Sequence, residues 1–258
     1  MANPSLKVMT FNIRYGTAND GLNSWPYRRE ACLEMLKTSG CPIIGLQEVL
    51  KSQLEEILTV MPDYRYLGMG REDGIEDGEY SAILYDATVL TSSDVGWFWF
   101  SDTPEIPASC TWGNICTRIC THAHFSGSFG EFAFYNLHID HESALSRSNS
   151  IDLLLSRISQ RSNSSPVIVT GDFNDDETSA PIRKMAQAGF IDAYRSLHPD
   201  EPERQTYHGW EEVDEGPRID YIFVQGVCLV EEATIDRRKF DGRFVSDHFP
   251  VTATLRLR

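Results

Sequence analysis

The chain has 258 residues, a length at which single α/β domains are common, and a formal net charge of −15 at pH 7. This charge disfavours duplex DNA as a partner, because non-specific DNA binding depends on basic side chains that displace counterions. No apolar run approaches the roughly 18 residues that a membrane-spanning helix needs, and the first residues lack the basic and apolar regions of a signal peptide. We expect one domain over residues 1–258 in the cytoplasm, with secretion as the alternative if a signal peptide preceded this sequence; no protein partner can be inferred.

Short apolar runs alternate with amphipathic stretches from end to end, which predicts sheets covered by helices. Helices are expected to begin near Pro26, Ser52, Glu142 and Thr178. The first has Gly40 at its end as a left-handed cap, and the second has a capping box in which Ser52 is followed by Glu55. The predicted strands cover residues 6–13, 42–47, 81–85, 115–125, 132–137, 167–170, 219–224, 227–235 and 250–257.

Three polar segments, 17–25, 68–79 and 97–114, are longer than simple connections between elements require. The third is rich in aromatic residues, which are predicted either to form an apolar wall beside a ligand or to pack against the core. These residues are Trp97, Phe98, Trp99, Phe100 and Trp112. We nominate Trp112 for substrate binding.

Polar side chains lie within or beside the ends of six predicted strands, the place where α/β proteins put their chemistry. Each residue alone has an ordinary explanation as a turn former, a solvated acid, a helix cap or a core histidine. Together they are hard to explain by folding, because such groups cost several kcal/mol when they are buried without partners. We expect them to converge on one pocket. The residues are Asn12, Glu48, His138, Asp172, Asn174, Asp220, Asp247 and His248.

The ordered segments TFNIR, GLQEV, NLHID, TGDFND, RIDYIFV and SDHFPV resemble those of the endonuclease/exonuclease/phosphatase superfamily, and of a compact microbial subgroup within it. The resemblance covers nearly the whole chain. It implies the deoxyribonuclease I-like fold, a four-layer α/β (α+β) sandwich in which two mixed β-sheets pack face to face with helices on the outside. It also implies an enzyme, a divalent-metal-dependent hydrolase of phosphoester bonds.

The resemblance further implies that Glu48, with Asn12 nearby and Asp247 in addition, binds the cation. Carboxylate and carboxamide oxygens suit Mg²⁺, with Mn²⁺ as a substitute. A zinc site built on His138 and His141 is a weaker alternative, because no third soft ligand stands at a helpful spacing.

The catalytic roles that the resemblance implies divide the reaction among five residues. His248 would be the general base, paired with Asp220, and His138 would stabilise the transition state. Asp172 and Asn174 would orient the attacking water.

Further residues are nominated for substrate binding. Arg118, inside a predicted strand that is otherwise uncharged, indicates either a phosphate contact or a structural salt bridge. Glu79 is a second candidate to pair with His248, or else a solvated loop acid. His141, three residues after His138, completes this group.

The function favoured by these observations is a phosphodiesterase acting on a small soluble, sugar-type or nucleotide-type substrate. The first alternative is a nuclease or deadenylase-like exonuclease on single-stranded nucleic acid, such as an oligonucleotide. The second is a catalytically silent binding protein of the same fold.

Overall fold

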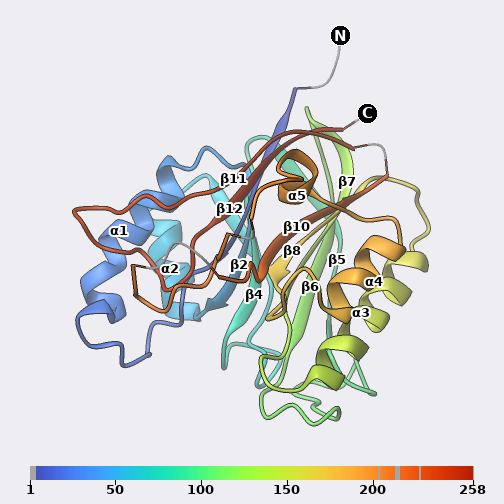
Figure 1. The fold of residues 1–258 in the computed structure, drawn as a ribbon, viewed down its shortest axis with the longest axis horizontal. Helices are drawn as coiled ribbons and strands as arrows, with labels where there is room; N and C mark the ends of the chain where they lie inside the picture. The colour runs from blue at the N-terminus through green and yellow to red at the C-terminus, as the bar shows by residue number, and fades with distance from the viewer. Residues whose placement is uncertain (1–3, 203, 213–215, 227, 258) are drawn as a thin grey trace.

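The computed structural model describes residues 4–202, 204–212, 216–226 and 228–257, apart from the side chain of Cys228. Two mixed six-stranded sheets pack face to face, and helices cover their outer faces (Figure 1). The four-layer, deoxyribonuclease I-like sandwich predicted from the sequence is therefore confirmed. Among the described helices, none has both the length and the apolar character needed to cross a bilayer.

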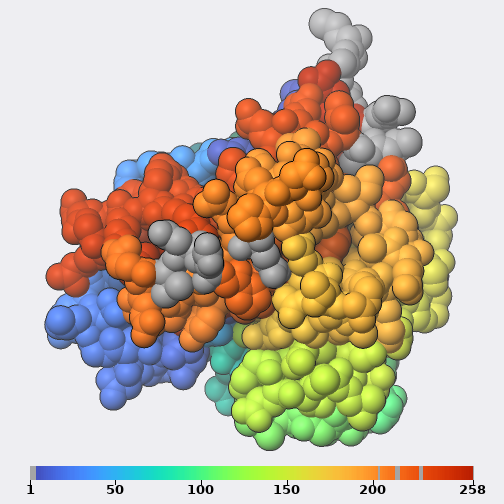
Figure 2. Space-filling view, in the orientation of Figure 1, coloured from blue at the N-terminus to red at the C-terminus, as the bar shows by residue number. Residues whose placement is uncertain are grey.

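The strands of the first sheet come from the two ends of the chain and those of the second from its middle, so blue and red surfaces adjoin in the space-filling view (Figure 2). In spatial order, the first sheet contains β11 (Cys228–Ile235), β12 (Val251–Leu257), β1 (Leu6–Asn12), β2 (Ile43–Val49), β4 (Tyr80–Asp86) and β3 (Tyr64–Leu67). The second contains β5 (Leu90–Trp99), β6 (Ile119–Gly127), β7 (Gly130–His138), β8 (Val167–Asp172), β10 (Asp220–Gln225) and β9 (Ile191–Asp192).

Apolar side chains fill three layers between these elements. The helices α1 (Trp25–Thr38) and α2 (Lys51–Val60) pack on the first sheet, and α3 (Ala144–Ser159) and α4 (Ala180–Gln187) pack on the second (Figure 1). Between the sheets lies the central core, to which the short α5 (Ala193–Leu197) contributes. The short 3₁₀ helix η1 (Gly21–Asn23) precedes α1.

The sequence did not predict β3, β5, β9 or α5. All three strands lie outermost in their sheets. The first part of β5, LTSSDVG, lacks an apolar run because much of it faces solvent, and the aromatic end of β5 falls in the segment 97–114 that the sequence predicted to be a connection. The predicted strand 115–125 begins only at Ile119, so Arg118 lies just before β6 rather than within it. Val227, the first residue of another predicted strand, lies outside the described residues.

Two predicted caps had different outcomes. Gly40 has φ of +66°, as a left-handed cap requires. The Ser52 capping box is wrong, because α2 begins at Lys51 and its N-cap is Leu50, whose backbone N–H donates to Gln53 Oε1 at 3.0 Å. Gln53 thus provides the side chain of the box, two residues earlier than the Ser52 pattern predicted.

Polar side chains fasten the two sheets together in the middle of the apolar core. Asn136 of β7 donates from Nδ2 to the backbone oxygens of Leu46 and Ala82 in the first sheet, both at 2.8 Å. Gln47 of β2 donates to Asn136 Oδ1 at 2.7 Å, and Thr170 of β8 donates to the same oxygen at 3.0 Å. All of these groups are buried, so the bonds fix one sheet against the other.

Glycine at position 45 is what lets this contact form. A Cβ placed on Gly45 would lie 2.2 Å from Thr170 Oγ1 and 2.4 Å from Asn136 Oδ1, which is closer than atoms can approach. Gly45 therefore sets the separation of the sheets at this point.

Replacing Gly45 with Ala is expected to lower the free energy of unfolding by about 1–3 kcal/mol, the usual cost of overpacking a core. Urea unfolding followed by circular dichroism measures it. The control is Ser52→Ala, which the Leu50 cap predicts to change stability by less than about 0.5 kcal/mol. A loss of about 1 kcal/mol in that control would instead restore Ser52 as the N-cap.

Candidate active site

A cavity of about 480 Å³ opens where several strands of both sheets end. Most of the residues nominated from the sequence line it, while Asn12 and Asp220 are buried beside it. The lining residues are Arg14, Tyr15, Glu48, Arg71, Glu79, Cys116, Arg118, His138, His141, Asp172, Asn174, Tyr207, Ile219, Asp247 and His248.

Strand alternation explains why these polar groups meet. Side chains two residues apart on a strand point to the same face. His138 lies two residues after Asn136 on β7, and Asp172 lies two residues after Thr170 on β8. The side chains of His138 and Asp172 therefore lie on the same face of the second sheet as those of Asn136 and Thr170, the face that looks toward the first sheet. The strand register then places His138 beside Asp172, and Asp172 opposite Asp220.

Glu48 reaches the cavity through an irregular backbone. Alternation from Gln47 would point Glu48 away from the second sheet, but the pairing of β2 with β4 shifts register between Leu46 and Val49. Glu48 has φ of +59°, a conformation that non-glycine residues rarely adopt. Such bulges re-aim side chains, and strained backbone of this kind is typical of functional sites.

His248 is held between two buried carboxylates. Its Nδ1 lies 2.9 Å from Asp220 Oδ2, and its Nε2 lies 3.7 Å from Asp172 Oδ2. Burial alone would lower the pKa of His248, but the charge and hydrogen bond of Asp220, together with the charge of Asp172, raise it to about 10. Burial and the charge of Asp220 raise the pKa of Asp172 to about 7. The three groups thus form a strongly interacting unit.

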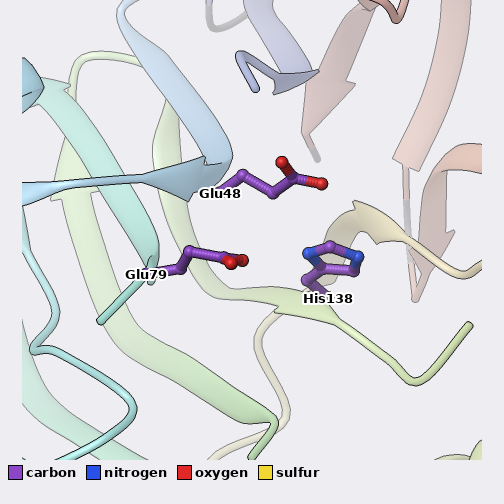
Figure 3. Close-up of side chains that lie close together, drawn as sticks. All are labelled: Glu48, Glu79 and His138. Atoms are coloured by element: carbon purple, nitrogen blue, oxygen red, sulfur yellow. The ribbon is translucent and has the colours of Figure 1, made fainter. Parts of the chain in front are cut away.

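A second group could hold a metal ion. Ligand atoms of Glu48, Glu79 and His138 all lie within 4.8 Å of one another, and the three side chains point toward a common space (Figure 3). Burial and the nearby guanidiniums of Arg118 and Arg71 keep the pKa of His138 well below its usual value, so the imidazole is neutral. Its Nδ1 is buried with no hydrogen-bond partner among the described residues. Two carboxylates and a neutral imidazole suit a divalent cation.

Amide side chains connect the two groups. Asn12 Nδ2 donates to Glu48 Oε1 and to Asp172 Oδ2, each at 3.0 Å. Asn174, with φ of +48°, places its Nδ2 at 3.0 Å from His138 Nε2, and its backbone N–H donates to Asp172 Oδ1 at 2.9 Å. The carboxylates and the imidazole are therefore oriented before any ligand arrives.

Arg14 and Arg71 belong to the site, although sequence reasoning missed them. Arg71 forms a two-bond contact with Glu79, at 2.8 and 2.9 Å. Arg14 lies between Glu48 and Asp247, at 3.8 and 3.6 Å. Arg14 ends the TFNIR motif and was available as a signal; Arg71 lies in the polar segment 68–79, where nothing in the sequence distinguishes it from a solvated charge.

Two nominations need correction, and a third stays open. Trp112 does not line the cavity, because it packs beside the cluster under α3 and donates to Asp102. Glu79 does not pair with His248, whose carboxylate partner is Asp220; it lies near His138 instead. His141 lines the cavity, so its nomination for substrate binding stays a prediction, but it is not part of the group around His138 that could hold a metal ion.

Most of the aromatic segment packs against the core, which was one of the two predicted alternatives. Phe98, Trp99 and Phe100 are buried away from the cavity, and Trp97 is 39% exposed outside it. Trp99 still supports the site indirectly, because its Nε1 donates to the backbone oxygen of Arg71 at 2.8 Å.

Comparisons with known proteins agree with this arrangement. The sequence profile of the Endonuclease/Exonuclease/phosphatase family matches residues 9–248. An uncharacterised protein of Acanthamoeba polyphaga mimivirus is 30% identical over 184 residues, which are 67% of this chain and 68% of that protein.

Two solved structures are similar over almost their full length. An endonuclease/exonuclease/phosphatase from Bacteroides vulgatus gives a TM-score of 0.91 at 30% identity, with 98% of this chain and 99% of that one covered. A mannosyl-6-phosphatase from Bacteroides thetaiotaomicron gives 0.88 at 32% identity, with 97% and 99% covered.

The family match and the relatives together define a hydrolase of phosphoester bonds. The chain belongs to the Endonuclease/Exonuclease/phosphatase family, as the sequence motifs indicated. Enzymes of this family generally depend on a divalent metal, and the group of Glu48, Glu79 and His138 offers a place for one.

Replacing Glu48 with Gln is expected to weaken Mn²⁺ binding by at least about tenfold, the loss seen even for supporting residues of metal sites. Isothermal titration calorimetry without substrate measures this. Glu131→Gln removes the same charge from an exposed position and should leave the affinity unchanged. Equal affinities of the Glu48 variant and the unaltered enzyme would show that other groups hold the ion.

Proposed function

We propose that this enzyme hydrolyses small soluble phosphoesters of the sugar-phosphate type, with a divalent cation and with His248 as general base. The observation that carries the proposal is the pairing, in one cavity, of the buried Asp220–His248 dyad with a separate group of possible metal ligands. Phosphoryl transfer gains mainly from positioning and from neutralising negative charge, and these two groups are suited to supply both.

Glu48, Glu79 and His138 are proposed to hold the cation, with Asn12 orienting Glu48. Mg²⁺ is the favoured ion, and the imidazole ligand makes Mn²⁺ a good substitute. When bound, the cation would polarise the phosphoryl group and offset its negative charge. Asp247 stays an additional candidate ligand, and its contact with Arg14 would then have to open.

His248 is proposed to take the proton from the attacking water at Nε2. Its Nδ1 is committed to Asp220, which fixes the tautomer and stabilises the imidazolium that forms. Asp172 and Asn174 are proposed to orient the water. The amide of Asn174 would orient the imidazole of His138, from which it lies 3.0 Å at Nε2. If His138 instead donates from Nε2 to a phosphoryl oxygen and stabilises the transition state, as the sequence motifs imply, this contact with Asn174 would have to open.

Replacing His248 with Ala is expected to reduce kcat by roughly 10²- to 10⁴-fold, as removal of a general base does. Because the base must be unprotonated and its pKa is raised, kcat/KM of the unaltered enzyme should increase with pH along a limb centred above the ordinary histidine value of 6.5. The variant should lose this limb.

The control is His124→Ala, a histidine of β6 outside the cavity, which should keep both turnover and pH profile. Near-normal turnover of the His248 variant would remove that residue from the mechanism.

A small substrate is favoured by three observations. The cavity has the volume of a small molecule, the aromatic segment that might have stacked bases lies elsewhere, and the chain is strongly acidic. The mannosyl-6-phosphatase of Bacteroides thetaiotaomicron, at 32% identity, supports a sugar phosphate.

Steady-state kinetics on mannose 6-phosphate and on oligonucleotides from dimers to decamers test this choice. We expect the higher kcat/KM for the sugar phosphate, no gain with oligonucleotide length, and loss of activity in chelator that Mg²⁺ or Mn²⁺ restores. A steep gain with length would favour the exonuclease alternative, and activity that persists in chelator would reject the metal.

A further inference from the structure

Arg118 is a buried cation whose hydrogen-bonding capacity the protein leaves mostly unused. It lines the cavity just before β6, and its side chain is 3% exposed. Among the described residues, its one hydrogen bond joins Nη2 to His141 Nδ1 at 2.8 Å. Its Nε is buried without a partner, and the nearest carboxylate oxygen, Asp140 Oδ2, lies 3.7 Å away. A guanidinium has five N–H donors, and no further hydrogen bond joins this one to the described residues.

A structural arginine in this protein has a different environment. Arg28 is equally buried, and its guanidinium donates to the backbone oxygens of Asn23, Ile13, Val245 and Arg14. That set of bonds satisfies the cation within the fold.

The other arginines of the cavity are already neutralised. Arg71 forms its two-bond contact with Glu79, and Arg14 is paired with Asp20 at 3.0 Å and lies near Glu48 and Asp247. Burial and the neighbouring Arg71 lower the pKa of Arg118, and the opposite effect of the Glu79 and Asp140 charges offsets this only in part. A buried and under-satisfied cation is costly unless an anion completes its environment.

We propose that Arg118 binds the unesterified oxygens of a terminal phosphate and thereby makes this enzyme select phosphomonoesters over phosphodiesters. The inference rests on the proposed function, and it replaces the diester preference expected from the sequence. A monoester carries close to two negative charges at neutral pH and one more free oxygen than a diester. A guanidinium fork in the same cavity as His138 favours that extra charge and oxygen, because bidentate charged hydrogen bonds are strong and directional.

The test compares 4-nitrophenyl phosphate with its methyl ester, which share one leaving group and differ only in the esterified oxygen. The unaltered enzyme should show higher kcat/KM for the monoester. In Arg118→Met, kcat/KM for the monoester should decrease roughly 10- to 100-fold, and that for the methyl ester by less than about threefold, because the lost bonds are charge-assisted. Arg118→Lys, which keeps the charge and loses the fork, should lie between.

Inhibition gives a second measurement. Orthophosphate has the same unesterified oxygens, so its inhibition constant against methyl-ester hydrolysis should increase at least about tenfold in Arg118→Met. Arg161→Met is the control, because Arg161 is a partly buried arginine that does not line this cavity. Circular dichroism shows whether each variant folds, and the Lys variant carries the comparison if the Met variant does not.

Two results would overturn the inference. One is an equal loss on both substrates in the folded Arg118 variants, which would make Arg118 a general structural support. The other is a diester preference of the unaltered enzyme that the variants leave unchanged. Failure of the unaltered enzyme to hydrolyse either compound with Mg²⁺ or Mn²⁺ would instead reject the proposed function, and with it this inference.

Discussion

The contact between the two sheets at Gly45 fixes the geometry of the active site, which lies further along the same strands. Asn136 reaches from one sheet to backbone oxygens of the other, and this is possible only because position 45 has no side chain. Since alternate residues share a face, the residues that follow along the same strands enter the cavity side by side. The positions of the catalytic side chains thus depend on a buried hydrogen-bond network between the sheets whose members have no direct role in the chemistry.

Above that contact, the site concentrates negative charge that the protein itself only partly compensates. Asp172 and Asp220 raise the pKa of the histidine between them, and burial raises the pKa of Asp247 and Glu79 as well. Neutralising such a cluster with a cation would stabilise the folded site. The left-handed backbone of Glu48 and of Asn174 is consistent with this, because strain is retained where function requires a particular direction of a side chain.

Opposite the acids, the positive groups have two distinct functions. Arg14 and Arg71 hold carboxylates in place and are largely neutralised by doing so, whereas Arg118 has one hydrogen bond, to His141, among the described residues. The same residue type therefore serves as structural support and as a recognition element within one cavity. A structural arginine differs from a recognition arginine here mainly in how many of its N–H groups have partners within the protein, and less in its charge or burial.

The sequence by itself determined the layered sheet architecture and most of the site. Apolar runs predict the buried strands, and the polar residues that interrupt this pattern at the strand ends predict the site. Outer strands such as β5 were not predicted, because much of β5 faces solvent and its first seven residues contain no apolar run. Only the tertiary structure decided which carboxylate pairs with His248 and that Glu79 lies near Glu48 and His138. It also decided that Trp112 does not line the cavity. Those facts depend on a bulge, on loop paths and on the distance between two sheets, and residues far apart in the chain determine all three.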